Sequence, residues 1–313
     1  MSKALVNKVK LNDVVSVKDF AVGDGVADDT AAIQAAINAV GDAGELFWPK
    51  GIYKVTSTLV QNYNRQRWTG VGRGASLIYF APTANDTCVE FGTTAGLKVL
   101  GSISDIGFYS DDSTYKKIAI DLIDVDIFAI DRVSIQGGIS VGGTLMWSGA
   151  TSVGLRVRGR DMISVNDLYV AADQPIQFSD NPTGTTTIDI DNSVFRDLYL
   201  IANANPCVLM DSGINITQVT FTGRQSWNKG TSGFKWADTA TSIVGNGLVF
   251  ENVRTEQGTD ATAYSFDISH NTALQNLAFR NCYFDLTRKG VKLRKCENVL
   301  LEQTSYYGIG EAY

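Results

Sequence analysis

The stretch from Val17 to Tyr53 constrains the fold of this chain more than any other part. It reads VKDFAVGDGVADDTAAIQAAINAVGDAGELFWPKGIY: an Asp/Gly-rich turn, an amphipathic segment and then a strand-like piece. Gly23 and Gly25 let the backbone adopt positive φ around Asp24, because glycine has no Cβ to clash there. The stretch therefore predicts a tight turn that feeds directly into a regular element.

That element is predicted to be a short helix over Thr30–Val40. Asp28 and Asp29 can accept hydrogen bonds from the free N–H groups of a helix start and interact favourably with its positive end. The apolar residues that follow recur at helical spacing and share one face: Ile33, Ala36, Ile37 and Val40. We interpret the aspartates as turn and helix-start residues rather than as catalytic ones.

The turn and helix together resemble the opening of the pectate-lyase-like superfamily found in bacteriophage tailspikes, D-F-G-A-x-G-D-G-x-x-D-D-T-x-A-I-Q. This chain has one residue fewer between Phe20 and Gly23. The resemblance implies an all-β fold, a right-handed single-stranded parallel β-helix with a short N-terminal capping helix. It also implies a tailspike-like function in the virion, where the protein would bind a bacterial surface polysaccharide.

Composition agrees with a solenoid and excludes several other classes. A solenoid can reach 313 residues because each repeat needs only its neighbours. The net charge of −6 argues against nucleic-acid binding, which requires a basic surface. Cys88, Cys207, Cys282 and Cys296 follow no metal spacing, and a lone His270 cannot form a His-rich site. We therefore expect no metal and no cofactor.

The remaining sequence carries a loose repeat. A polar residue flanked by apolar ones returns at Asp105, Arg132, Asp167, Asp197, Gln218, Asn252, Asn281 and Asn298. Successive members are 27, 35, 30, 21, 34, 29 and 17 residues apart. Short strands at such a variable period are typical of a parallel β-helix, and a β-sandwich would show more hairpin signals than the single Asn246-Gly247. We predict a cap segment over 1–54 and a β-helix over 55–313, with regular coils from Val55 to Gln303.

The two ends of a solenoid expose strand edges that need covering. The helix would cover the first. Only ten residues, Thr304–Tyr313, follow the last expected strand. Either a partner chain covers that end or the chain is cut short there. We expect a homotrimer that associates through polar strand faces such as the columns at Thr220 and Thr222, and other phage tail or baseplate proteins are further partners.

Stacked coils place equivalent residues in columns about 4.7–4.9 Å apart. With the polar residue of each repeat as position zero, positions +2 and +4 point outward. The +4 column ends in three candidate catalytic carboxylates, Glu256, Asp285 and Glu302. Repulsion between like charges would raise the pKa of at least one of them, which suits a general acid. Neighbours would lie roughly 5 Å apart, as in retaining glycosidases, and Glu256 and Glu302 roughly 9–10 Å apart, near the inverting range.

The +2 column supplies candidate substrate-binding residues. Tyr169, Tyr199 and Tyr283 offer flat faces for sugar rings, and Arg254 can hold an acidic sugar's carboxylate. Trp227 is expected to be exposed in a loop over Gly223–Trp236, where it forms a rival sugar-binding patch with Arg224 and Lys229. Trp236 is expected in the core.

The alternative to a catalytic column is a solvated β-face. In that case the carboxylates pair with Arg254, Arg280 or Lys292 and do no chemistry. A slip of one residue in the assumed register would also scatter the column, because successive residues of a strand point to opposite faces.

Three functions fit these observations. The first is a phage tailspike that depolymerises capsule, O-antigen or exopolysaccharide, as a glycoside hydrolase or as a polysaccharide lyase. The second is a non-catalytic structural or receptor-binding part of a phage tail. The third is a cellular polysaccharide lyase or hydrolase. The third is disfavoured because Met1–Lys10 lacks the apolar core of a signal peptide, and no run has the length of a membrane span.

Overall fold

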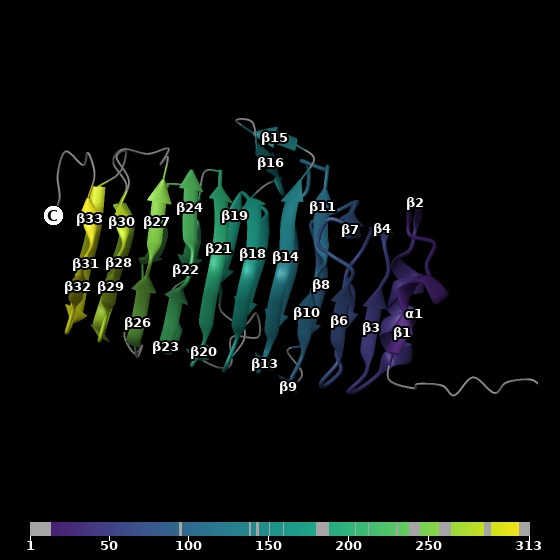
Figure 1. Ribbon diagram of the computed structural model, residues 1–313, viewed down its shortest axis with the longest axis horizontal. Coiled ribbons are helices and arrows are strands. Elements are labelled where there is room, and N and C mark those ends of the chain that lie inside the picture. Colours follow the sequence, from purple (N-terminus) through teal and green to yellow (C-terminus); the bar gives the residue numbers. More distant parts are fainter. Residues whose placement is uncertain are drawn as a thin grey trace, which may run out of the picture.

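Stacked coils of short strands build an elongated parallel β-helix (Figure 1). The computed structural model describes residues 14–93, 96–137, 139–141, 144–149, 151–158, 160–179, 188–203, 205–211, 213–229, 231–237, 245–256, 264–284 and 289–306. Among the described residues, twenty-nine strands join one continuous sheet that winds around the core. Within the described residues, the named strands pair in parallel except in the hairpin of β15 (Ile139–Val141) and β16 (Thr144–Met146). The predicted fold class is confirmed.

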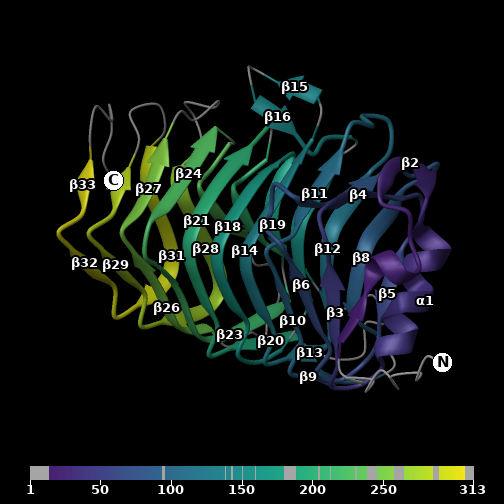
Figure 2. The same ribbon diagram turned by 45° about the vertical axis from the view of Figure 1, so that its right-hand side comes forward.

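The N-terminal end of the stack carries α1 (Thr30–Val40), which spans the predicted residues (Figure 2). Its buried residues are the four that the spacing selected: Ile33, Ala36, Ile37 and Val40. The short 3-10 helix η1 (Val17–Asp19) precedes it. The amphipathic pattern therefore identified both the element and the face that it buries.

The aspartates of the opening turn serve local structure. Asp28 accepts a hydrogen bond from the Thr30 N–H at 3.1 Å, at the helix start as predicted. Asp29 makes no side-chain cap, and here the prediction was wrong. Its carboxylate oxygens instead accept the N–H groups of Val22 and Gly23 at 2.8 and 2.9 Å. Asp29 thus links the start of the helix to the turn that precedes it.

Three stacks of strands form the walls of the solenoid. Sheet 1 contains β5 (Leu59–Gln61), β8 (Asp86–Gly92), β12 (Lys117–Ile123), β17 (Val153–Arg158), β19 (Gln174–Phe178), β22 (Val208–Met210), β25 (Phe234–Ala237), β28 (Tyr264–Gln275) and β31 (Lys289–Glu297). Sheet 2 contains β1 (Val14–Ser16), β3 (Glu45–Trp48), β6 (Arg67–Gly70), β10 (Ser102–Ser104), the first parts of β14 (Ala129–Gly137), β18 (Ser164–Ala172) and β21 (Val194–Ala202), the second parts of β23 (Ile214–Thr222) and β26 (Gly245–Glu251), then β29 (Ala278–Arg280) and β32 (Leu300–Glu302).

Sheet 3 carries the candidate site. It contains β2 (Asp24–Asp28), β4 (Gly51–Val55), β7 (Ser76–Phe80), β11 (Gly107–Ser110), the second parts of β14, β18 and β21, then β24 (Gln225–Lys229), β27 (Val253–Glu256), β30 (Tyr283–Phe284) and β33 (Ser305–Tyr306). Smaller ladders pair β9 (Lys98–Val99) with β13 (Val125–Asp126), and β20 (Ile188–Asp191) with the first part of β23.

The polar residues of the predicted repeat lie at corners between strands, and these corners form two rows along the solenoid, not one. The row between sheets 2 and 3 holds residues of positive φ at Asp105, Arg132, Asp167, Asp197, Gly223, Asn252, Asn281 and Gln303. A second row, which precedes sheet 2, holds Leu100, Ile127, Met162, Asn192, Gln218, Gly247, Asn276 and Asn298. Gln218 and Asn298 therefore belong to the second row. The two shortest predicted intervals, 21 and 17 residues, arise from this mixing of rows.

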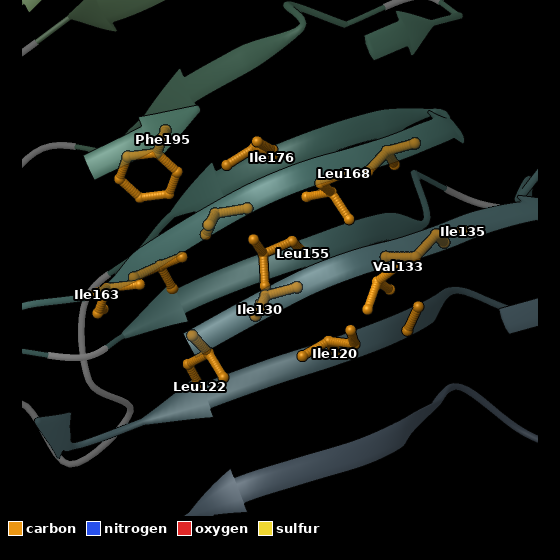
Figure 3. Close-up of a cluster of buried hydrophobic side chains, with 14 of the residues drawn as sticks. Ile120, Leu122, Ile130, Val133, Ile135, Leu155, Ile163, Leu168, Ile176 and Phe195 are labelled. Atoms are coloured by element: carbon orange, nitrogen blue, oxygen red, sulfur yellow. The ribbon is translucent and has the colours of Figure 1, made fainter. Parts of the chain in front are cut away.

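Inward-pointing side chains from successive coils align into columns in the core. Ile120, Leu155 and Ile176 occupy paired positions on adjacent strands of sheet 1 (Figure 3). Phe195, Phe221, Phe250 and Phe279 form a column of stacked rings, with centroids 5.0, 5.4 and 5.1 Å apart. The repeated stacking explains why one residue type recurs at intervals of a coil along the chain.

Candidate functional site

The outer face of sheet 3 presents one continuous column of polar and aromatic residues. Its members lie in register on successive strands: Gly107, Ser134, Tyr169, Tyr199, Ser226, Arg254, Tyr283 and Ser305. The rings of Tyr169 and Tyr199 stack with centroids 5.5 Å apart and planes inclined by 11°. Burial, and then the neighbouring Tyr199, raise the pKa of Tyr169. The structure thus brings together four of the predicted substrate-binding residues.

The predicted column of three carboxylates does not form. Glu256 lies on sheet 3, where it pairs in register with Asn228. Glu302 lies on sheet 2, in register with Arg280, and its carboxylate is 3.6 Å from that guanidinium. Asp285 lies outside the described residues. The prediction placed Glu302 on the wrong sheet because Asn298 belongs to the other corner row.

Glu256 also has a partner. Its carboxylate forms an ion pair with Arg254, whose guanidinium carbon lies 5.2 Å from the centre of the Tyr283 ring. The alternative of a solvated face, with carboxylates paired to Arg254 and Arg280, therefore describes Glu256 and Glu302. A substrate that used Glu256 would first have to displace this ion pair.

Trp227 is fully buried, so the prediction that it is exposed was wrong. It points inward from β24, where its indole N–H donates to the Gln225 side-chain oxygen at 3.1 Å. Its ring packs against Phe221 at 5.5 Å in an edge-to-face arrangement. Trp236 is buried as predicted. The loop assumed around Trp227 is a strand of sheet 3, and strand alternation turns the ring toward the core.

A corner with one extra residue opens a pocket beside the stacked tyrosines. Arg196 pairs with Thr222 and Tyr199 pairs with Ser226 on the next coil. Two residues separate Arg196 from Tyr199, whereas three residues separate Thr222 from Ser226. The added residue makes the corner Gly223-Arg224 where the neighbouring corners have a single residue. Gly223 has φ +76°, and a Cβ there would lie 2.6 Å from Asp197 Oδ1. Glycine is therefore required for this corner to pack against the one below it.

The resulting hollow has a volume of about 490 Å³, and we call it the corner pocket. Its lining residues are Asp167, Asp197, Leu198, Tyr199, Arg224 and Ser226. Such a concave site combines an aromatic face with a few hydrogen-bonding groups, as carbohydrate and other small-molecule sites commonly do.

Two carboxylates occupy adjacent corners of the pocket wall. Asp197 Oδ1 accepts the backbone N–H of Arg224 at 2.6 Å. Asp167 Oδ1 accepts a hydrogen bond from Arg73 Nη1 at 3.0 Å. The flanking residues of the two aspartates pair in register on β18 and β21, so their backbones are separated by one strand spacing of about 4.8 Å. These contacts hold both carboxylates in place while the pocket side stays open.

A second polar cluster lies on the outer face of sheet 1. Asp121 is fully buried, and each of its carboxylate oxygens accepts hydrogen bonds from Arg156 and Arg158. Glu90 occupies the directly opposite position on β8. Burial, followed by the nearby Asp121, raises the pKa of Glu90. A half-buried carboxyl group of this kind can act as a proton donor.

Within the described ranges, no group of three or more His, Cys, Asp or Glu side chains is placed to hold a metal ion. The same part of the chain contains no helix that is long and apolar enough to cross a membrane.

Comparisons with known proteins agree with this geometry at the level of the fold. Residues 14–141 match the family model described as rhamnogalacturonase A/epimerase, pectate lyase-like. The mannuronan C5-epimerase AlgE1 of Azotobacter vinelandii is 59% identical over 44 residues, which are 13% of this chain and 3% of that protein. The chain thus spans a small part of this curated relative.

Two solved structures are similar over most of this chain. The enzymatically active domain of tailspike protein 2 from bacteriophage CBA120 has 13% identity and a TM-score of 0.58, over 92% of this chain and 43% of that one. The A-module of mannuronan C-5 epimerase AlgE6 from Azotobacter vinelandii has 16% identity and a TM-score of 0.53, over 91% and 79%. The resemblance to a pectate-lyase-like parallel β-helix is confirmed at the level of the fold.

The corner pocket was missed from the sequence although two of its residues were singled out. Asp167 and Asp197 were recognised as polar residues of the repeat and interpreted as structural. Arg224 was noted only as a neighbour of Trp227. A usable signal did exist: the corner between Thr222 and Gln225 has two residues, Gly and Arg, in place of one Asp or Asn. Recognising it requires the strand register, which only the stacked coils supply.

Proposed function

We propose that this protein is a tailspike-type polysaccharide depolymerase that binds a bacterial surface glycan at the corner pocket. The observation that carries the proposal is the pocket itself, with Tyr199 as a platform and Asp167 and Asp197 on adjacent corners. Tyr199 is 44% exposed, so one ring face is free for a sugar. The aspartates and Ser226 can hydrogen-bond to hydroxyl groups, which fixes the orientation of the ring. The likeness to polysaccharide-acting proteins of the same fold supports this assignment.

The two aspartates suit cleavage of a glycosidic bond with retention of configuration. One strand spacing brings two carboxyl groups to about 5 Å, the separation at which one acts as acid and the other as nucleophile. The acid donates its proton to the leaving oxygen, and the nucleophile forms a covalent glycosyl intermediate that water then hydrolyses. Water finally gives its proton back to the acid, so the enzyme is restored.

The test uses purified capsular, O-antigen and exopolysaccharides from a panel of bacteria. Release of reducing ends without absorbance of an unsaturated uronate indicates a hydrolase, and both signals together indicate a lyase. Asp167→Asn and Asp197→Asn should each lower turnover by about 10²–10⁴, the usual contribution of acid–base catalysis, with little change in melting temperature. The matched control is Asp189→Asn, an exposed aspartate on β20 away from the pocket. Full turnover in both pocket variants would remove the assignment.

Three other residues compete for the chemistry. Glu256 and Asp285 stay candidate catalytic residues from the sequence, with Arg254 and Tyr283 beside Glu256. Glu90 is a separate candidate acid because its pKa is raised. Amide variants at these three positions, assayed with the aspartate variants, assign the site to whichever face loses turnover.

Binding without cleavage is the second candidate function. It is favoured by the partners that both aspartates already have, Arg73 for Asp167 and the Arg224 N–H for Asp197. In that case the protein is a receptor-binding part of a phage tail. It would bind a polysaccharide of the panel with neither signal of cleavage.

A place in the virion tail and a trimeric state complete the proposal. Thr220 and Thr222, expected in the trimer contact, lie on sheet 2 and not on the pocket face. Association through sheet 2 would leave the corner pocket free. Light scattering at micromolar concentration should give the mass of three chains, and the Thr220→Arg variant should shift it toward one. A monomeric wild-type protein would count against the trimer.

A further inference from the structure

Arg73 crosses the pocket face from a distant part of the chain. It lies in the turn between β6 and β7, 94 residues before its partner Asp167. Its Nη1 donates to Asp167 Oδ1 at 3.0 Å and to the Asp167 carbonyl oxygen at 3.2 Å. Its own carbonyl oxygen accepts the Ser134 hydroxyl at 3.4 Å. Arg73 therefore spans from β14 to the corner at Asp167 within β18, and we call this crossing the Arg73 strap.

The sheet beneath is adapted to the strap. An added Cβ at Gly107 would lie 2.2 Å from the Arg73 carbonyl oxygen, so any other residue type at this position would push the turn away. Ser134, the next residue in the column, is small and donates a hydrogen bond to the same oxygen. The two small residues thus leave room for the strap on β11 and β14.

Along the stack, the strap contacts β14 between two aromatic pairs of sheet 3, which are offset from each other by two residues along their strands. On one side, Tyr79 and Tyr109 form a tilted pair with centroids 5.5 Å apart. On the other side, Tyr169 and Tyr199 stack next to the corner pocket. Without the Arg73 side chain, β14 would present Ser134 and Gln136 between the two pairs, beside the backbone of the turn.

We propose that the Arg73 strap is a specificity-determining element that ends the glycan-binding track at Asp167 and excludes the Tyr79–Tyr109 surface from it. This inference rests on the proposed glycan binding at the corner pocket. The track then runs from Tyr169 past Tyr199, Ser226 and Arg254 to Tyr283. These five positions lie on consecutive strands, and four strand spacings give a length of about 19 Å. A glycan can extend beyond Tyr283 but not past Arg73.

The closed end makes a specific prediction about length. Affinity should rise with oligosaccharide length until the chain fills about 19 Å and then level off. Removal of the guanidinium in Arg73→Ala should let longer oligosaccharides gain further affinity, because the Tyr109 surface becomes part of the track. Gly107→Ala displaces the same strap by a different route and should act in the same direction.

The decisive experiment is a double-mutant cycle on the most tightly bound polysaccharide of the panel. Oligosaccharides of graded length are prepared from it by partial acid hydrolysis, and their Kd values are measured by calorimetry. Tyr109→Ala should leave Kd unchanged in the wild-type background but weaken binding of the longest oligosaccharide severalfold in the Arg73→Ala background. The interaction between the two substitutions is the signature of the strap, and a structural effect on the fold would not depend on oligosaccharide length.

The outcomes separate the two proposals. If the wild-type protein binds no polysaccharide of the panel, the proposed function fails and this inference fails with it. If the wild-type protein binds and Tyr109→Ala weakens binding equally in both backgrounds, the proposed function stands and the strap does not limit the track. If Kd depends on oligosaccharide length identically in wild type, Arg73→Ala and Gly107→Ala, the proposed function likewise stands and the strap does not limit the track.

Discussion

Tyr199→Ala is the change that most directly tests glycan binding at the corner pocket. Tyr199 is 44% exposed, and its ring lies on the pocket wall beside Tyr169. A fully buried tyrosine removes roughly 200 Å² from water, so roughly 90 Å² of Tyr199 is open to solvent. Because the other face stacks on Tyr169, this area comprises the free face and the ring edge, and a sugar on the free face buries about half of it.

The expected loss follows from this area. About 45 Å² at about 25 cal/mol per Å² corresponds to ~1.1 kcal/mol, or about a sixfold increase in Kd. Tyr199→Phe keeps the ring and should bind within about twofold of the wild type, because the stacking face is unchanged. The substitution to alanine also removes the stack on Tyr169, which should lower the free energy of unfolding by about 0.5–1.5 kcal/mol.

Calorimetric titration with one oligosaccharide, together with thermal unfolding, measures both quantities. Wild-type affinity in Tyr199→Ala would show that the ring face is not used. An equal loss in Tyr199→Phe and Tyr199→Ala would show that the hydroxyl group carries the contact. Either result refutes the stacking argument, and the alanine variant must remain folded for the comparison to count.

Three further predictions address the corner, the core and the second polar cluster. Gly223→Ala should lower the free energy of unfolding by about 1–2 kcal/mol because of its positive φ, and it should also weaken glycan binding because the added Cβ clashes with Asp197. The control is Gly213→Ala, at φ +94°, where an added Cβ has no atom within 4 Å. In the same denaturation and titration assays, the control should lose stability but not glycan binding. Phe250→Ala should lower the free energy of unfolding by about 3–5 kcal/mol in chemical denaturation, because the ring is fully buried within the phenylalanine column; a loss below 1 kcal/mol would contradict that packing. For Glu90, a raised pKa means that the folded state binds the proton more tightly than the unfolded state, so stability is lost as pH rises through the folded pKa. Glu90→Gln should therefore raise the melting temperature relative to wild type at pH 8 but not at pH 4, and an equal effect at both pH values would exclude the linkage.

Local sequence was sufficient for the opening of the fold. Helical spacing selected the four buried residues of α1, and glycines beside aspartates marked the turn before it. The parallel β-helix also followed from the sequence, because the opening stretch resembles that of a known β-helix superfamily and polar residues between short apolar runs recur from Asp105 to Asn298. The turn and the helix depend on residues within a few positions of each other, so the local sequence is enough to predict them.

The assignment of residues to sheets required the tertiary structure. Both corner rows use residues of positive φ with similar sequence surroundings, so Gln218 and Asn298 could not be told apart from the true members of the other row. A wrong member moves the residues counted from it to a different sheet. For that reason Glu302 was expected above Glu256 and lies instead beside Arg280.

The candidate site depends on contacts between residues that are still farther apart in the sequence. Its pocket exists because one coil has an extra residue at Gly223-Arg224, and that excess is visible only against the coils above and below. Its closed end depends on Arg73, which meets Asp167 across 94 residues. The sequence by itself determined that the chain winds into coils and which residues of α1 point inward. Only the stacking of those coils decided which side chains meet on the surface, because loop lengths vary from turn to turn and the register between strands is set by packing.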